Sequence, residues 1–267
     1  MLTAGTTTAA GGLYGEGPLE FSADFFIRGL WFSVPLMFVL LMHEMGHYLA
    51  GRLHNLNVTL PYFLPAMPPV GTFGAFIKIR SLITNRNMLM DVGASGPLAG
   101  SIAAMPLLIA GLYHSKIAPH PEQAEFLSLG SSLILELLVY MRFGEFSSNL
   151  TISLHPTAMA AWFGLFVTAL NLLPIGQLDG GHVVYALFGP RAARVVSYGA
   201  FAVLIPLGIM TWPGWLVFGA LLVFLGLKHP PPLDPATPLQ RGRRIMGWVC
   251  ILLFILTFIP VPIQLGP

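Results

Sequence analysis

The feature that most constrains this chain is a series of apolar runs, each close to the length that crosses a lipid bilayer. A membrane-spanning helix needs about 20 mostly apolar residues, and such runs lie at 26–51, 91–113, 156–188, 193–211, 213–227 and 245–263. Hydrophobic residues make up 55% of the chain and charged residues 9%, which is too few charges to cover a water-soluble surface. The sequence therefore predicts an all-α polytopic membrane protein with about six transmembrane helices, and it excludes a cytosolic enzyme and a nucleic-acid-binding protein.

A seventh apolar stretch, Phe126–Phe143, contains Glu136 and is flanked by polar residues, so its length alone does not decide whether it crosses. The basic residues do decide. If the stretch stays on one side, ten basic residues fall on one face and three on the other, whereas crossing would divide them five against eight. The more basic face is the cytoplasmic one. We therefore expect an interfacial or re-entrant helix near 126–143 and both chain termini on the non-cytoplasmic side.

The chain divides into three parts. Residues 1–25 contain no Lys or Arg and are rich in Gly and Thr, which predicts a flexible N-terminal lead-in. Residues 26–188 hold the first three spans, together with a short membrane-associated β-hairpin near 58–80, where the segment TFGAFIKIR alternates as a strand does. Residues 189–267 are expected to form three additional C-terminal transmembrane helices.

The first apolar run contains the pattern H-E-x-x-H as His43-Glu44-Met45-Gly46-His47. On a helix the two histidines share one face, where they can ligate one zinc ion while the glutamate activates water. Three ionisable groups within one turn of a membrane helix are costly unless they are paired or bound to a metal. The pattern therefore predicts a zinc site inside the membrane. Because Cys250 is the only cysteine, further protein ligands must be His, Asp or Glu.

Asp179 is the candidate third ligand, because it lies in the segment NLLPIGQLDGGH (171–182), whose Pro and Gly residues interrupt a helix within an apolar run. Non-helical backbone at membrane depth is tolerated where it is buried in protein or lines a water-filled cavity. His43 lies nine residues before Arg52, and Asp179 lies twelve before Arg191. At 1.5 Å per residue, both are within about 13–18 Å of the more basic face. We therefore expect two separate spans to supply the ligands of one zinc ion per chain.

These motifs resemble those of the site-2 protease family of intramembrane zinc metalloproteases, in its bacterial and plastid branch. The resemblance rests on HEMGH, GTFGA, GASGPLAG and NLLPIGQLDGGH, in that order, and runs from about Val34 to Phe188. It implies that residues 26–188 contain the family's three-helix metalloprotease core. It also implies that the 58–80 element presents the substrate as an added strand.

The resemblance assigns roles to five residues of this sequence. It implies that His43, His47 and Asp179 are the zinc ligands and that Glu44 is the general base. It further implies that Asn171, on the interrupted segment, helps to hold substrate or to stabilise the oxyanion.

The function expected from the resemblance is zinc-dependent endoproteolysis within or near transmembrane segments, as in regulated intramembrane proteolysis. The expected partners are single-span membrane protein substrates and the lipid bilayer, and a regulatory membrane partner is left open. The expected location is a bacterial plasma membrane, with the active site toward the cytoplasmic side. Two alternatives remain, a metal-ion transporter and a non-proteolytic membrane scaffold. A transporter has no need of Glu44 between the two histidines, and a scaffold has no need of the complete ligand set.

Other polar or small residues near these motifs are interpreted as structural. The glycines of GASGPLAG (93–100) form a small-residue face that lets helices approach closely, beside the helix that carries the histidines. Asp91 is expected to be a helix N-cap. His54 and His182 are left out of the ligand set, because neither has the H-E-x-x-H spacing.

Overall fold

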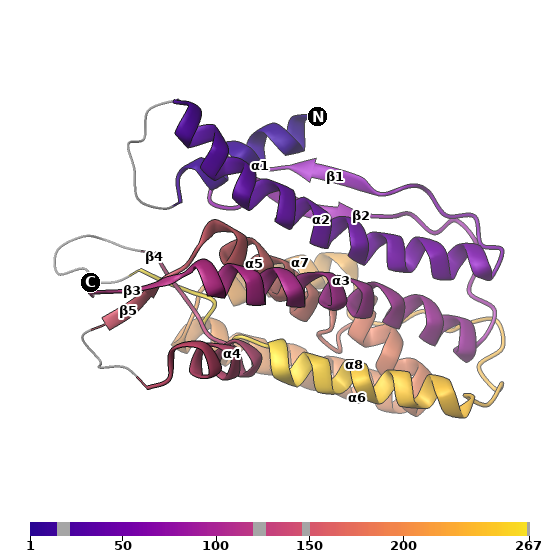
Figure 1. The fold of residues 1–267 in the computed structure, drawn as a ribbon. Helices are drawn as coiled ribbons and strands as arrows, with labels where there is room; N and C mark the ends of the chain where they lie inside the picture. The colour runs from indigo at the N-terminus through magenta and orange to yellow at the C-terminus, as the bar shows by residue number, and fades with distance from the viewer. Residues whose placement is uncertain (15–21, 120–126, 146–149, 266–267) are drawn as a thin grey trace.

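The computed structural model describes residues 1–14, 22–119, 127–145 and 150–265, and within these ranges the fold is mainly helical. Figure 1 shows most of the long helices running roughly along one direction. The helices are α1 (Leu2–Gly12), α2 (Ala23–Leu53), α3 (Arg86–His114), α4 (Leu133–Phe143), α5 (Pro156–Asn171), α6 (Asp179–Met210), α7 (Gly214–Leu225) and α8 (Arg241–Thr257). The strands are β1 (Tyr62–Pro65), β2 (Thr72–Phe76), β3 (Lys116–Pro119), β4 (Leu127–Leu129), β5 (Leu150–Ser153) and β6 (Ile263–Leu265).

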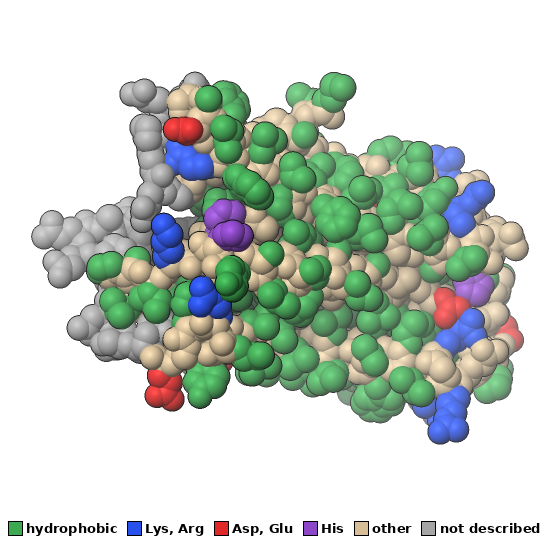
Figure 2. All heavy atoms as spheres, viewed as in Figure 1, with side chains coloured by type: hydrophobic (Ala, Val, Ile, Leu, Met, Phe, Trp, Pro, Cys, Tyr) green, Lys and Arg blue, Asp and Glu red, His purple; other side chains and the backbone are tan. Residues whose placement is uncertain are grey.

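Three of the described helices, α2, α3 and α6, are long and apolar enough to cross a membrane. At 1.5 Å per residue, the 31 residues of α2 extend about 46 Å, more than the roughly 30 Å of the hydrocarbon core. Figure 2 shows hydrophobic side chains over the middle of the visible face and Lys and Arg side chains toward its two ends. A bundle that lies in a bilayer requires this distribution, because apolar side chains meet lipid and charged ones meet water.

Helix α6 bends sharply at Gly189, which has φ 83° and ψ 179°. A positive φ of this kind is readily adopted by glycine, which has no Cβ. The second half of α6 returns alongside the chain that precedes the helix, since the Gly176 N–H donates to the Ser197 hydroxyl over 3.0 Å. The boundary expected between residues 188 and 189 therefore coincides with a bend in the chain.

The remaining helices are shorter. Helices α5, α7 and α8 have 16, 12 and 17 residues. Helix α4 has 11 residues, about 16 Å, which is too short to cross a bilayer. The expected non-crossing helix near 126–143 thus corresponds to α4, which begins at Leu133. Phe126, where the expected helix began, lies outside the described residues.

Strands β1 and β2 form an antiparallel pair within the region where a hairpin was expected. Tyr62 pairs with Phe76, and Phe63 pairs with Ala75. Figure 1 shows β1 passing beside α1, and β2 contacts both α1 and α2. The association of this pair with the membrane remains a prediction.

A helix, α1, occupies much of the segment for which the sequence predicted a flexible lead-in, so the expectation is wrong for Leu2–Gly12. Its small residues allow close packing, because a Cβ at Gly11 would lie 2.6 Å from the Phe32 Cβ of α2. The Thr7 hydroxyl lies 2.6 Å from the Ser33 hydroxyl, and the Thr3 hydroxyl donates to the Phe63 carbonyl over 3.1 Å. Contacts with α2 and β1 therefore order a segment that its own sequence does not mark as a helix.

Candidate metal centre

The HEMGH motif lies in the second half of α2 and turns its ionisable side chains into the protein interior. His43, Glu44 and His47 retain only 3%, 6% and 8% of their accessible surface. Asp179 is the first residue of α6. Its Oδ2 atom lies 3.3 Å from His43 Nε2 and 3.3 Å from His47 Nε2. The structure therefore brings the three residues predicted as metal ligands to one point, with Glu44 next to them in sequence.

The geometry and the donor set fit zinc. The three ligand atoms lie within 4.8 Å of one another. Zinc binds nitrogen and oxygen at about 2.0–2.1 Å in a tetrahedron, so two of its ligand atoms should be about 3.3–3.4 Å apart. Both His–Asp distances match this value. Three protein ligands are also the usual number in a catalytic zinc site, where the fourth position is open.

Each histidine is oriented by a second contact through its other ring nitrogen. His47 Nδ1 lies 2.7 Å from the Val92 carbonyl, which can only accept a hydrogen bond, so Nδ1 carries the hydrogen and Nε2 keeps its lone pair. His43 Nδ1 lies 3.5 Å from the Thr168 hydroxyl, which itself donates to the Gly164 carbonyl over 2.9 Å. Contacts of this kind fix the ring orientation and the tautomer of metal-binding histidines.

The glycines of α3 let this helix approach the histidines. A Cβ at Gly96 would lie 2.5 Å from His47 Cδ2, with Nε2 closer still, and a Cβ at Gly100 would lie 3.1 Å from His43 Nδ1. Gly93 instead faces α6, where a Cβ would lie 2.5 Å from the His182 Cβ, so the expectation that the glycines pack beside the motif helix is confirmed for Gly96 and Gly100. Their glycine identity also bears on the site itself, because they touch the rings that would hold the metal.

The broken segment between α5 and α6 holds Asp179 in place. Gly176 has φ 54°, and a Cβ there would overlap the Gly226 carbonyl. The Ser197 hydroxyl accepts from the Gly176 N–H and donates to the Leu227 carbonyl over 2.7 Å. The second half of α6 and the start of the α7–α8 loop therefore both support the segment that leads to Asp179.

Two further groups line the centre. Asn171, the last residue of α5, places its Nδ2 atom 3.2 Å from His43 Nε2, so an N–H donor faces the point where the ligand atoms meet. The backbone of Ile77, directly after β2, lies close enough to the Glu44 carboxylate to interact with it. The centre is therefore bordered by an amide donor on one side and by the end of a β-strand on another.

Asp91 has a different role from the one expected. The N-cap of α3 is Asn85, whose side chain accepts from the Met88 N–H over 3.0 Å. Asp91 instead lies within the helix and accepts from Arg243 of α8 at 2.7 and 2.6 Å and contacts His54 Nε2 at 2.7 Å. The sequence did not indicate this cluster, because its members are separated by 37 and 152 positions.

A second histidine pair was also missed. His182 Nδ1 lies 2.6 Å from His229 Nε2, which joins the first turn of α6 to the loop between α7 and α8. Burial, together with the charge of His182 when protonated, lowers the pKa of His229 to about 4. No sequence spacing marks this pair, which depends on how the loop folds over α6.

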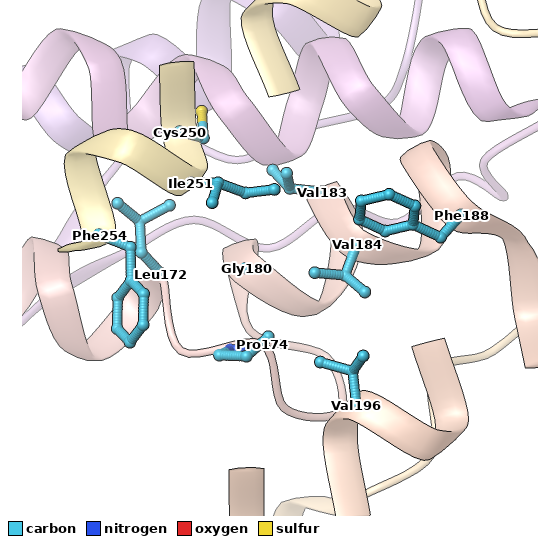
Figure 3. A pocket seen from close by; sticks show the side chains of 10 residues that line it. All are labelled: Leu172, Pro174, Gly180, Val183, Val184, Phe188, Val196, Cys250, Ile251 and Phe254. Atoms are coloured by element: carbon cyan, nitrogen blue, oxygen red, sulfur yellow. The ribbon is translucent and has the colours of Figure 1, made fainter. Parts of the chain in front are cut away.

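Behind the broken segment lies an apolar pocket of about 210 Å³. Figure 3 shows Leu172 and Pro174 of that segment beside Phe254 of α8, with Val184 and Val196 facing each other from the two halves of α6. All ten residues that line it are apolar or are glycine or cysteine. It separates the metal-centre segment from α8 without adding a polar group to the centre.

Two histidines of an H-E-x-x-H helix and an aspartate of a second long apolar helix thus form a candidate metal centre. Residues 31–212 match peptidase family M50, and the chain belongs to this family.

Two relatives illustrate the similarity. The chain is 32% identical over 230 residues to the protein named "Probable zinc metalloprotease EGY1, chloroplastic" of Arabidopsis thaliana, covering 84% of this chain and 41% of the relative. It is 30% identical over 235 residues to "Probable zinc metalloprotease EGY2, chloroplastic" of Oryza sativa subsp. indica, covering 85% and 42%. The chain thus spans about two fifths of the length of these relatives. The names of both relatives include zinc. In this chain His43, His47 and Asp179 are positioned to hold a metal ion.

Proposed function

We propose that this protein is a zinc-dependent endopeptidase that hydrolyses peptide bonds within or near transmembrane segments of other membrane proteins. The observation that carries the proposal is the convergence of two histidines and one aspartate within 4.8 Å, beside a buried glutamate. Membership of peptidase family M50 supports it. Neither a transporter nor a scaffold accounts for Glu44 between the two histidines.

In this proposal His43, His47 and Asp179 hold the metal. A zinc ion held in this way supplies Lewis acidity, which makes water more acidic and a peptide carbonyl more electrophilic. Glu44 takes a proton from the attacking water and passes it to the leaving amine as the C–N bond breaks. The Asn171 side-chain N–H, which faces the same point, donates to the oxygen on which negative charge develops.

The substrate is proposed to be a single-span membrane protein whose helix unwinds locally, because a hydrogen-bonded helical peptide bond is shielded from attack. The contact between Ile77 and Glu44 supports delivery of the unwound segment along the β1–β2 element, which we propose is associated with the membrane. A regulatory membrane partner is compatible with this arrangement.

For the membrane topology we propose about six spans, with residues 26–188 as the metalloprotease core and residues 189–267 as three additional helices. In this arrangement α5, the broken segment and the first half of α6 make up the third span. Helices α2 and α3 are the first two spans. The second half of α6, α7 and α8 are the last three. We propose a bacterial plasma membrane as the location, with the site toward the cytoplasmic side. The distribution of Lys and Arg supports the choice of side.

The test is zinc content and cleavage measured on the detergent-purified protein with a panel of single-span substrates. Glu44→Gln should keep one zinc per chain and lose cleavage, whereas His43→Ala should lose the metal. Glu136→Gln, on α4 away from the centre, is the matched control and should behave as wild type. Cleavage that persists in Glu44→Gln would refute the assigned mechanism, and a wild type that binds no zinc would refute the metal centre.

A further inference from the structure

A second pocket, distinct from the metal centre, lies between the bend of α6 and the loop that follows α7. It has a volume of about 410 Å³, which is within the range of small-ligand sites. Tyr185 forms part of its wall, and His229, Lys228 and Arg194 line it as well. None of its nine lining residues is acidic. The pocket therefore combines two cations with three neutral polar side chains, those of Tyr185, His229 and Gln177.

Two polar atoms on its wall lack hydrogen-bond partners. Among the described residues, three buried side-chain nitrogen or oxygen atoms make no hydrogen bond, and two of these are Tyr185 Oη and His229 Nδ1. Leaving such a group unsatisfied is costly, so two on one pocket indicate a ligand that satisfies them. His229 Nε2 is already engaged with His182 Nδ1 at 2.6 Å. When His182 donates that bond, His229 carries its hydrogen on Nδ1 and can donate it.

The charges of the pocket indicate the sign of the ligand. Arg194 and Lys228 are exposed, and neither is in an ion pair with an acidic side chain in the part of the chain that the structure describes. Two unpaired cations together with two neutral donors match a group that carries about two negative charges and at least three acceptor oxygens. A carboxylate offers only one charge and two oxygens.

We propose that this pocket binds a phosphate group, either free in solution or at the head of an anionic lipid. Both sources are available at the more basic face of the protein, where the surface of an anionic membrane also attracts Lys and Arg. The proposal does not depend on proteolysis, because it concerns a site that shares no ligand residue with the metal centre.

The test measures the melting temperature of the full-length chain in an uncharged detergent at constant ionic strength. One arm adds inorganic phosphate, and the other adds short-chain phosphatidic acid, with short-chain phosphatidylcholine as the matched lipid. A bound ligand stabilises the folded protein in proportion to its saturation. We expect Arg194→Gln combined with Lys228→Gln to weaken binding by about tenfold or more, and Tyr185→Phe, which removes only the hydroxyl, to weaken it less.

Arg191→Gln is the matched control, because Arg191 is exposed on the same helix and does not line the pocket. Stabilisation by inorganic phosphate that is lost in the double variant and kept in Arg191→Gln supports a site for a free anion. The same pattern with phosphatidic acid alone supports a lipid headgroup. Equal responses in the double variant and in Arg191→Gln, or no response of the wild type to either probe, would overturn the proposal. The melting temperature reports binding and not cleavage, so this outcome would not bear on the proposed protease function.

Discussion

Replacing Gly96 by alanine tests whether the approach of α3 to α2 sets the geometry of the metal centre. The new Cβ would lie 2.5 Å from His47 Cδ2, about 1 Å inside the optimal carbon–carbon separation of roughly 3.5 Å. The ring cannot simply turn away, because its Nδ1 is held by the Val92 carbonyl at 2.7 Å. Either the ring or a helix must therefore shift by about 1 Å, several times the ±0.2 Å that metal–ligand distances tolerate.

We expect Gly96→Ala to weaken zinc binding by about 10- to 100-fold, the range seen when groups that orient metal ligands are lost. The overlap should also lower the free energy of unfolding by about 1–3 kcal/mol. Zinc affinity is measured by competition with a chromophoric chelator, and stability by thermal unfolding of the metal-free protein in detergent.

Two control variants separate the effect on the metal from the effect on folding. Gly208→Ala produces a similar overlap, 2.5 Å from Leu216 Cγ, between the second half of α6 and α7, so it should destabilise the protein without moving a ligand ring. Gly199→Ala meets nothing within 4 Å and should leave both quantities nearly unchanged. If Gly96→Ala binds zinc as tightly as Gly208→Ala does, the proposed link between helix spacing and ligand geometry is wrong.

Three further predictions address other parts of the protein. Asn171→Ala should keep zinc bound and lower kcat by about 10²–10³-fold with little change in KM, because a donor to the developing oxyanion acts mainly in the transition state; an equal loss of zinc would instead mean that Asn171 supports the ligands. Asp91→Ala should lower the free energy of unfolding by about 1–3 kcal/mol, since it removes the two hydrogen bonds that Arg243 donates to Asp91, and unchanged thermal unfolding would contradict this role. Burial and the neighbouring His182 lower the pKa of His229 from 6.5 to about 4, so the unfolded chain takes up a proton more readily. Stability should therefore be complete above pH 6.5 and fall between about pH 6.5 and 4. His229→Gln should flatten that part of the stability curve, and a curve unchanged by the substitution would exclude His229 as its cause.

The parts of the metal centre that the sequence predicted are those encoded locally. His43 and His47 lie four residues apart, so any helix brings them to one face, and Asp179 is marked by the helix-breaking residues around it. The cluster of Asp91, His54 and Arg243 could not be predicted, because no local pattern indicates which distant cation meets a given carboxylate.

Helix α1 is a second feature that the local sequence pattern does not predict. Gly and Thr have low helix propensity, so the sequence of residues 2–12 predicts little helix when it is considered alone. In the fold, the same small residues permit the close approach to α2 that stabilises the helix, since Cβ atoms at Gly11 and Gly12 would overlap the Phe32 and Phe25 side chains. Tertiary contact, which a local pattern does not contain, decides the structure of this segment.

The support of Asp179 extends beyond the residues that match the family. The match ends at residue 212, but the Leu227 carbonyl accepts from Ser197, which in turn holds Gly176 of the broken segment. His229, also outside the match, contacts His182 one turn after Asp179. A carboxylate at the start of a helix without a side-chain cap depends on such neighbours for its position. The loop after α7 therefore belongs to the structure of the metal centre, and variation of this loop among relatives would change how firmly the third ligand is held.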